Sequence, residues 1–166
     1  MEKVTPATAK IPQIYILPKV HKKVLAGRPI IPGFGWITTP ASIFLDDILQ
    51  VLLKRTPTVI ADSKSLLVQM NTLQIGNPDC RVITADVSSL YTEIPTDLGI
   101  LFMKQFISEN SDLLPIATQK LIIDLLTIVM KNNFFQFQGE YYHQVKGTAM
   151  ETPVAVVFAN IFMYML

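Results

Sequence analysis

The stretch Val82–Pro95 limits the choice of fold more than any other part of this chain. A short apolar run leads to a single carboxylate, Asp86, after which the pattern changes to a polar turn. Tyr91 follows five residues later, ahead of a new amphipathic segment. We therefore predict a strand over Arg81–Asp86 that ends in an acid at a strand-to-helix turn. An acid at such a turn is also a common helix cap, so the pattern by itself leaves both roles open.

The chain is unusually apolar. Hydrophobic residues make up 50% of it and charged residues 16%, with a mean hydropathy of +0.38, whereas about a quarter of residues are charged in typical soluble domains. The longest nearly unbroken apolar run, Pro153–Leu166, has 14 residues and is interrupted by Asn160. A helix that spans a membrane needs roughly 20. We therefore expect no membrane partner, and expect a fragment whose apolar surface meets polypeptide outside this sequence.

Positive charge is concentrated at one end of the chain. Residues 1–31 carry six Lys or Arg and one acid, a net +5, while residues 32–166 carry a net −4. A surface that faces phosphates requires such a concentration, although a solvated basic arm has the same pattern. Because Cys80 is the single cysteine, the chain cannot form an internal disulfide. With two histidines and one cysteine, a zinc site or a Ser-His-Asp hydrolase is not expected. We expect an intracellular protein.

Residue spacing predicts an α+β fold with long helices and few strands. Extended segments are expected over Ile11–Leu17 and Arg28–Ile31, on either side of a basic loop over Lys19–Gly27. Phe134–Gln144 alternates in the manner of a β-hairpin. A turn is predicted over Gly76–Asp79. Helical spacing predicts helices over Pro40–Arg55, Asp62–Leu73, Thr96–Asn110, Pro115–Asn132 and Pro153–Leu166.

Four blocks of the sequence, in order, span nearly the whole chain. The blocks are LPKVHK at Leu17–Lys22 with GRPI at Gly27–Ile30, DVSSLYTEIP at Asp86–Pro95, NNFFQFQGEYYHQ at Asn132–Gln144, and KGTAM at Lys146–Met150 with FANIFM at Phe158–Met163. They resemble the reverse transcriptases of Penelope-like retroelements, and their order and spacing make the resemblance specific.

The resemblance implies an incomplete right-hand polymerase fold without a thumb. Residues 1–166 would form a partial reverse transcriptase domain, with the fingers over about 1–80 and part of the palm over about 81–166. The chain would stop before the hairpin that carries an aspartate pair in such enzymes, so the rest of the palm and the thumb would be missing partners. We therefore expect the 166-residue polypeptide to show no polymerase turnover alone.

The resemblance also assigns the chemistry. In such enzymes a primer 3′-hydroxyl attacks the α-phosphate of a deoxynucleoside triphosphate opposite an RNA template, with two divalent ions at the reacting oxygens. By resemblance, Asp86 is the catalytic carboxylate that bridges two Mg²⁺ or Mn²⁺ ions, and the Val87 backbone carbonyl is a further ligand. Tyr91 would lie under the sugar, where its ring excludes a 2′-hydroxyl and so selects deoxynucleotides.

Other positions would contact the nucleotide and the nucleic acid. Lys19 and Arg28 would bind the triphosphate, and the planar arginine side chain offers phosphate two parallel hydrogen bonds. Gln144 matches the position that contacts nucleotide and template near the minor groove, and Gly147 and Met150 would form the wall beside it.

Local sequence allows simpler roles for the same residues. On local evidence alone, Lys19 and Arg28 would be exposed charges on a hairpin and Gln144 an ordinary polar residue at a strand end. Tyr91 is compatible with a core aromatic that closes a turn. The aromatic residues of Phe134–Gln144 are typical of sheet packing.

Some residues depart from the family pattern or imitate it. Glu151 stands where the resemblance predicts glycine, and its charge is expected to crowd or repel the template strand; Val156 stands where proline is common. Asp46 and Asp47 look like an aspartate pair, but they lie in a helical pattern where neighbouring side chains diverge by about 100°. We interpret them as part of a solvated helix face.

Two hypotheses follow from these patterns. In the first, the chain is a reverse transcriptase domain whose activity belongs to an intact element that works in the nucleus. In the second, it is a non-enzymatic retroelement remnant that binds nucleic acid through its basic end, or protein through its apolar surface. A downstream hairpin with two adjacent aspartates would favour the first.

Overall fold

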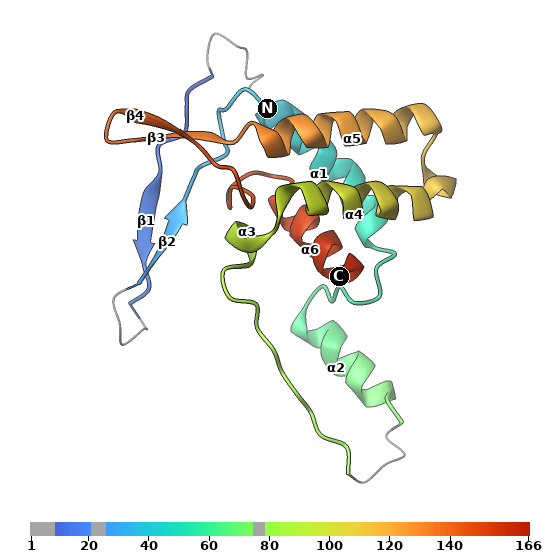
Figure 1. Ribbon diagram of the computed structural model, residues 1–166. Coiled ribbons are helices and arrows are strands. Elements are labelled where there is room, and N and C mark those ends of the chain that lie inside the picture. Colours follow the sequence, from blue (N-terminus) through green and yellow to red (C-terminus); the bar gives the residue numbers. More distant parts are fainter. Residues whose placement is uncertain (1–8, 21–25, 75–78) are drawn as a thin grey trace.

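The computed structural model describes residues 9–20, 26–74 and 79–166. Long helices are packed together with the β-hairpins beside them, and α2 (Ser63–Thr72) stands apart (Figure 1). The packed helices are α1 (Thr39–Leu53), α4 (Thr96–Glu109), α5 (Ile116–Lys131) and α6 (Ala155–Met165). The fold class is α+β, as the sequence predicts; the finer assignment to a right-hand polymerase remains a prediction.

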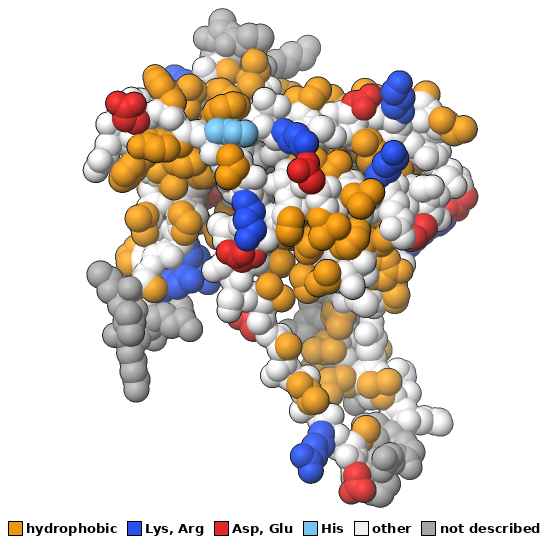
Figure 2. Space-filling view, in the orientation of Figure 1, with side chains coloured by type: hydrophobic (Ala, Val, Ile, Leu, Met, Phe, Trp, Pro, Cys, Tyr) orange, Lys and Arg blue, Asp and Glu red, His pale blue; other side chains and the backbone are white. Residues whose placement is uncertain are grey.

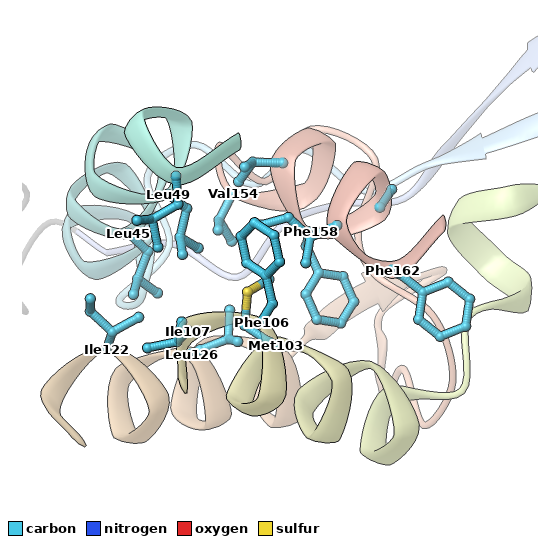
Figure 3. Packing of buried hydrophobic residues seen from close by; sticks show 14 of the residues in the cluster. Leu45, Leu49, Met103, Phe106, Ile107, Ile122, Leu126, Val154, Phe158 and Phe162 are labelled. Atoms are coloured by element: carbon cyan, nitrogen blue, oxygen red, sulfur yellow. The ribbon is translucent and has the colours of Figure 1, made fainter. Parts of the chain in front are cut away.

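The core lies where these four helices meet. In α1, Leu45 and Leu49 are fully buried one turn apart, and α5 presents Ile122 and Leu126 with the same spacing. In the same cluster, Phe158 points from α6 toward α4 (Figure 3). Because α1 comes from the first half of the chain and its partners from the second, one hydrophobic core holds both halves together.

The five predicted helices are confirmed, with ends that differ by one or two residues. Asp62 caps α2, since its carboxylate accepts a hydrogen bond of 2.7 Å from the backbone N–H of Ser65. Asp46 and Asp47 lie inside α1, as predicted for a helix face. Two short turns of helix were not predicted, α3 at Leu90–Glu93 and a 3₁₀ turn at Ser111–Leu113.

Both hairpins are antiparallel and two-stranded. The first pairs β1 (Tyr15–Pro18) with β2 (Gly27–Ile30), so its first strand is shorter than predicted; residues 21–25 of the expected basic loop lie outside the described ranges. The second pairs β3 (Phe134–Phe137) with β4 (Glu140–His143) around a turn in which Gln138 and Gly139 both have positive φ.

A backbone bridge fastens the two hairpins to each other. The N–H of Ile14 donates to the carbonyl of Gln136 at 3.1 Å, and the N–H of Gln136 donates to the carbonyl of Pro12 at 2.8 Å. The first hairpin is therefore anchored at its base, from which it extends away from the helices (Figure 1).

The strand predicted over Arg81–Asp86 is wrong. This segment is extended but exposed, with Val82 and Ile83 at 83% and 87% relative exposure. A strand needs neighbours to pair its N–H and C=O groups, and the sheets in the described ranges are the two hairpins, neither of which includes it. Most of the turn predicted at Gly76–Asp79 lies outside the described residues. In the described part of the chain, no helix has the length and apolar character needed to cross a membrane.

Candidate functional site

An open cleft of about 810 Å³ separates the β1–β2 hairpin from the loop that leads into α3. Lys19 and Arg28 line the hairpin side, while Asp86, Val87 and Tyr91 line the loop side. Figure 2 shows the molecule hollowed between this hairpin and the body, with one group of Lys and Arg side chains beside the lower end of the hairpin. The remaining lining residues are Gly27, Pro29, Ala85, Ser88, Ser89, Leu90, Thr92 and Met150.

The charges in the cleft are not neutralised by one another. Within the described ranges, the side chains of Lys19, Arg28 and Asp86 take part in no ion pair. Arg28 and Asp86 are exposed, and Lys19 is partly exposed. Two cations and one carboxylate that face a common solvent-filled space can each bind an added ligand without first breaking an internal contact.

The loop that carries Asp86 turns sharply at Ser89. Ser89 has a φ of 56°, in the left-handed region that non-glycine residues seldom occupy. Its carbonyl accepts hydrogen bonds from the N–H groups of Thr92 and Glu93, which starts the single turn of α3. As a result, Tyr91 lines the cleft and also packs against the edge of the hydrophobic core. The position of Tyr91 agrees with the packing role, and its contact with a sugar stays a prediction.

Gly147 and Thr148 form backbone hydrogen bonds with this loop. Its N–H donates to the carbonyl of Ile94 at 3.0 Å, and the N–H of Thr148 donates to the carbonyl of Tyr91 at 2.7 Å. Gly147 has a φ of 79°, and a Cβ added to it would lie 2.4 Å from the Tyr91 carbonyl oxygen. Gly147 thus approaches the backbone of the α3 loop closely and is not among the residues that line the cleft; its place in a wall facing the template stays a prediction.

Gln144 lies beside the main cleft, in a smaller cavity of about 210 Å³. The two cavities share Pro29, Thr92 and Met150 as lining residues. The Gln144 side chain donates a hydrogen bond to the carbonyl of Lys146 at 3.0 Å, while its buried Oε1 has no partner in the described protein. The structure therefore places Gln144 and Met150 next to the predicted nucleotide residues, with Met150 reaching both spaces.

The two metal ligands predicted on this chain lie together. Asp86 and Val87 both line the cleft, and no group of three or more His, Cys, Asp or Glu residues is close enough to bind a metal within the described ranges. Mg²⁺ commonly takes one or two carboxylates, with phosphates and waters completing six oxygens. Binding of an ion by Asp86 and the Val87 carbonyl therefore stays a prediction.

Sequence reasoning missed one contact at this site. The hydroxyl of Tyr15 donates a hydrogen bond of 2.9 Å to Oε1 of Glu151, across 136 residues of sequence. The Glu151 carboxylate raises the pKa of Tyr15, chiefly through this hydrogen bond. The sequence marks Glu151 only as a departure from the family pattern, and no local sequence pattern predicts its contact with Tyr15.

The comparisons with known proteins add no relative. No family model matches the chain, and no curated protein matches it. The resemblance to reverse transcriptases therefore rests on the sequence blocks themselves.

Proposed function

We propose that this chain is the nucleotide-binding part of an RNA-directed DNA polymerase, a reverse transcriptase domain of the Penelope-like type. One observation carries the proposal. Lys19 and Arg28, from one segment, face the same cleft as Asp86, from a segment more than fifty residues away. Charges of opposite sign around one open space suit a ligand that brings both phosphates and a divalent cation.

In this proposal each wall of the cleft has its own task. Lys19 and Arg28 bind the triphosphate of a deoxynucleotide, Arg28 through two parallel hydrogen bonds. Asp86 and the Val87 carbonyl hold the cation that accompanies the triphosphate. Bound Mg²⁺ or Mn²⁺ supplies neutralisation of phosphate charge and activation of the primer hydroxyl. Tyr91 orients the sugar, and Gln144 and Met150 contact the nucleotide or template from the neighbouring cavity.

A second candidate is a non-enzymatic remnant that binds nucleic acid or protein. The observation in its favour is the lone carboxylate, because the described part of the cleft supplies fewer acids than two-ion catalysis needs. A remnant would keep the cationic hairpin, and so would bind phosphates whether or not Asp86 were present.

Nucleotide binding with and without Mg²⁺ separates these two candidates. Titration of the wild-type chain with a deoxynucleoside triphosphate should show binding that Mg²⁺ strengthens, and Asp86→Asn should remove that Mg²⁺ effect. Asp124→Asn is the matched control, because Asp124 is exposed on α5. Lys19→Ala should weaken binding by about tenfold, whereas Lys120→Ala should not. Nucleotide binding that depends on neither Mg²⁺ nor Asp86 would refute the polymerase proposal and favour the non-enzymatic remnant. The absence of any nucleotide binding would refute both proposed roles of this cleft.

A further inference from the structure

We propose that Tyr15 and Glu151 act as a pair of positioning residues that hold the cationic hairpin over the Asp86 loop; this inference rests on the proposed function. The hydroxyl of Tyr15 and the carboxylate of Glu151 meet at 2.9 Å. Tyr15 is on β1, and Glu151 lies in the turns between β4 and α6. The bond therefore joins two segments that form different walls of the cleft.

The strand register shows what the bond positions. Tyr15 is paired with Ile30, and Leu17 is paired with Arg28. Directly paired residues, and residues two apart on a strand, point to the same face of a sheet, so Arg28 projects from the face that carries Tyr15. On the other side of the bond, Met150 precedes Glu151 and lines the cleft with Arg28. Fastening Tyr15 to Glu151 therefore sets the position of Arg28 relative to the Met150 wall.

Few other side-chain contacts hold the hairpin. Among the described residues, the Tyr15–Glu151 bond is the one side-chain hydrogen bond or ion pair between the β1–β2 hairpin and the rest of the protein. The backbone bridge from Ile14 to Gln136 and the buried Ile30 of β2 also hold its base, whereas all four residues of β1 are exposed. Without the Tyr15–Glu151 bond, we expect the hairpin to be held less firmly against the segment that carries Glu151.

The same bond deals with the charge of Glu151. A carboxylate beside a phosphate site repels its ligand, which is the difficulty that the sequence raised at this position. In the structure, Glu151 accepts the Tyr15 hydrogen bond and does not line the cleft, although its neighbour Met150 does. The acid thus serves as a hydrogen-bond acceptor for the hairpin, and its carboxylate is not among the groups that line the cleft.

Deoxynucleotide affinity in the presence of Mg²⁺ tests the pair. Tyr15→Phe and Glu151→Ala should each weaken binding by about fivefold, and the double variant should be no weaker than either single variant. Glu151→Gln keeps an acceptor oxygen and should bind nearly as well as the wild type. Tyr141→Phe removes the same hydroxyl from an exposed tyrosine on β4 and should change nothing.

A second measurement does not depend on nucleotide. Hydrogen exchange of the β1–β2 amides should become faster in Tyr15→Phe and Glu151→Ala and remain unchanged in Tyr141→Phe. Tighter nucleotide binding by Glu151→Ala and Glu151→Gln would show that the acid only repels phosphate, which would overturn the inference. Unchanged exchange in both singles would overturn it as well. If the wild type bound no nucleotide, the proposed function would fail, and exchange alone would decide whether the pair fastens the hairpin.

Discussion

Gly147→Ala is the sharpest test of how the cleft is built. The added methyl group would meet backbone atoms on the loop behind Tyr91: the Tyr91 carbonyl oxygen at 2.4 Å and the Thr92 Cα at 2.7 Å. Backbone atoms in a hydrogen-bonded turn cannot swing aside as the end of a long side chain can. The clash therefore has to be relieved by moving the α3 loop away from Thr148, with the loss of one or both of their hydrogen bonds.

Two terms add to give the expected magnitude. A non-glycine residue in the left-handed region costs about 1–2 kcal/mol, and overpacking a well-packed site costs about 1–3 kcal/mol. We therefore expect Gly147→Ala to lower the free energy of unfolding by about 2–5 kcal/mol, a large part of the stability of a small domain. Because Tyr91 is on the displaced loop, deoxynucleotide affinity should fall in any fraction that remains folded.

Gly35→Ala separates the two terms. Gly35 has the same φ of 79° as Gly147, but nothing lies within 4 Å of its added Cβ. Denaturant unfolding of both variants should show a difference of about 1–3 kcal/mol, which is the cost of the clash alone. Equal losses would refute the reasoning, since they would mean that the loop behind Tyr91 yields without cost and does not define the wall of the cleft.

Three further predictions concern the hydrophobic core, sugar selection by Tyr91, and α2. Leu126→Ala removes a fully buried side chain of α5 and should lower the free energy of unfolding by about 3 kcal/mol, measured in the same denaturant series. Tyr91→Ala should bring the affinities for ATP and dATP close to equal, and an unchanged preference would remove the sugar-selecting role. Hydrogen bonds from the N–H groups at the start of α2 lower the pKa of Asp62 from its ordinary value of 3.8. The contribution of this cap to α2 is therefore complete above that pH and is lost as the pH falls through the lowered pKa. Amide exchange in Ser63–Thr72, corrected for intrinsic rates, should accelerate below about pH 4, and a flat profile there would contradict the capping role.

The helices were predictable because the spacing of apolar residues within each helix is enough to identify it. In α5, apolar residues recur at helical spacing from Ile122 to Val129, and the helix buries that face and exposes the other. The second hairpin was equally plain, since Gly139 interrupts two alternating aromatic runs. Both patterns are local, and both are satisfied by neighbours within the described chain.

The segment Arg81–Asp86 shows where local patterns fail. Its composition is that of a buried strand, but a strand is completed by partners that its own sequence does not specify. The contact of Tyr15 with Glu151 was unpredictable for a related reason, because it depends on how a hairpin and a distant turn meet. The left-handed Ser89 was missed as well, since serine gives no sign of positive φ.

The segment Gly147–Glu151 is bonded to both walls of the cleft. At one end, Gly147 and Thr148 hold the loop that carries Tyr91 through two backbone hydrogen bonds. At the other end, Glu151 holds the hairpin that carries Arg28, and Met150 lines the space between them. Both walls of the cleft are thus fastened to five consecutive residues ahead of α6. A substitution in these residues should therefore change nucleotide affinity more than an equally destabilising substitution in α5, for which Leu126→Ala is the reference.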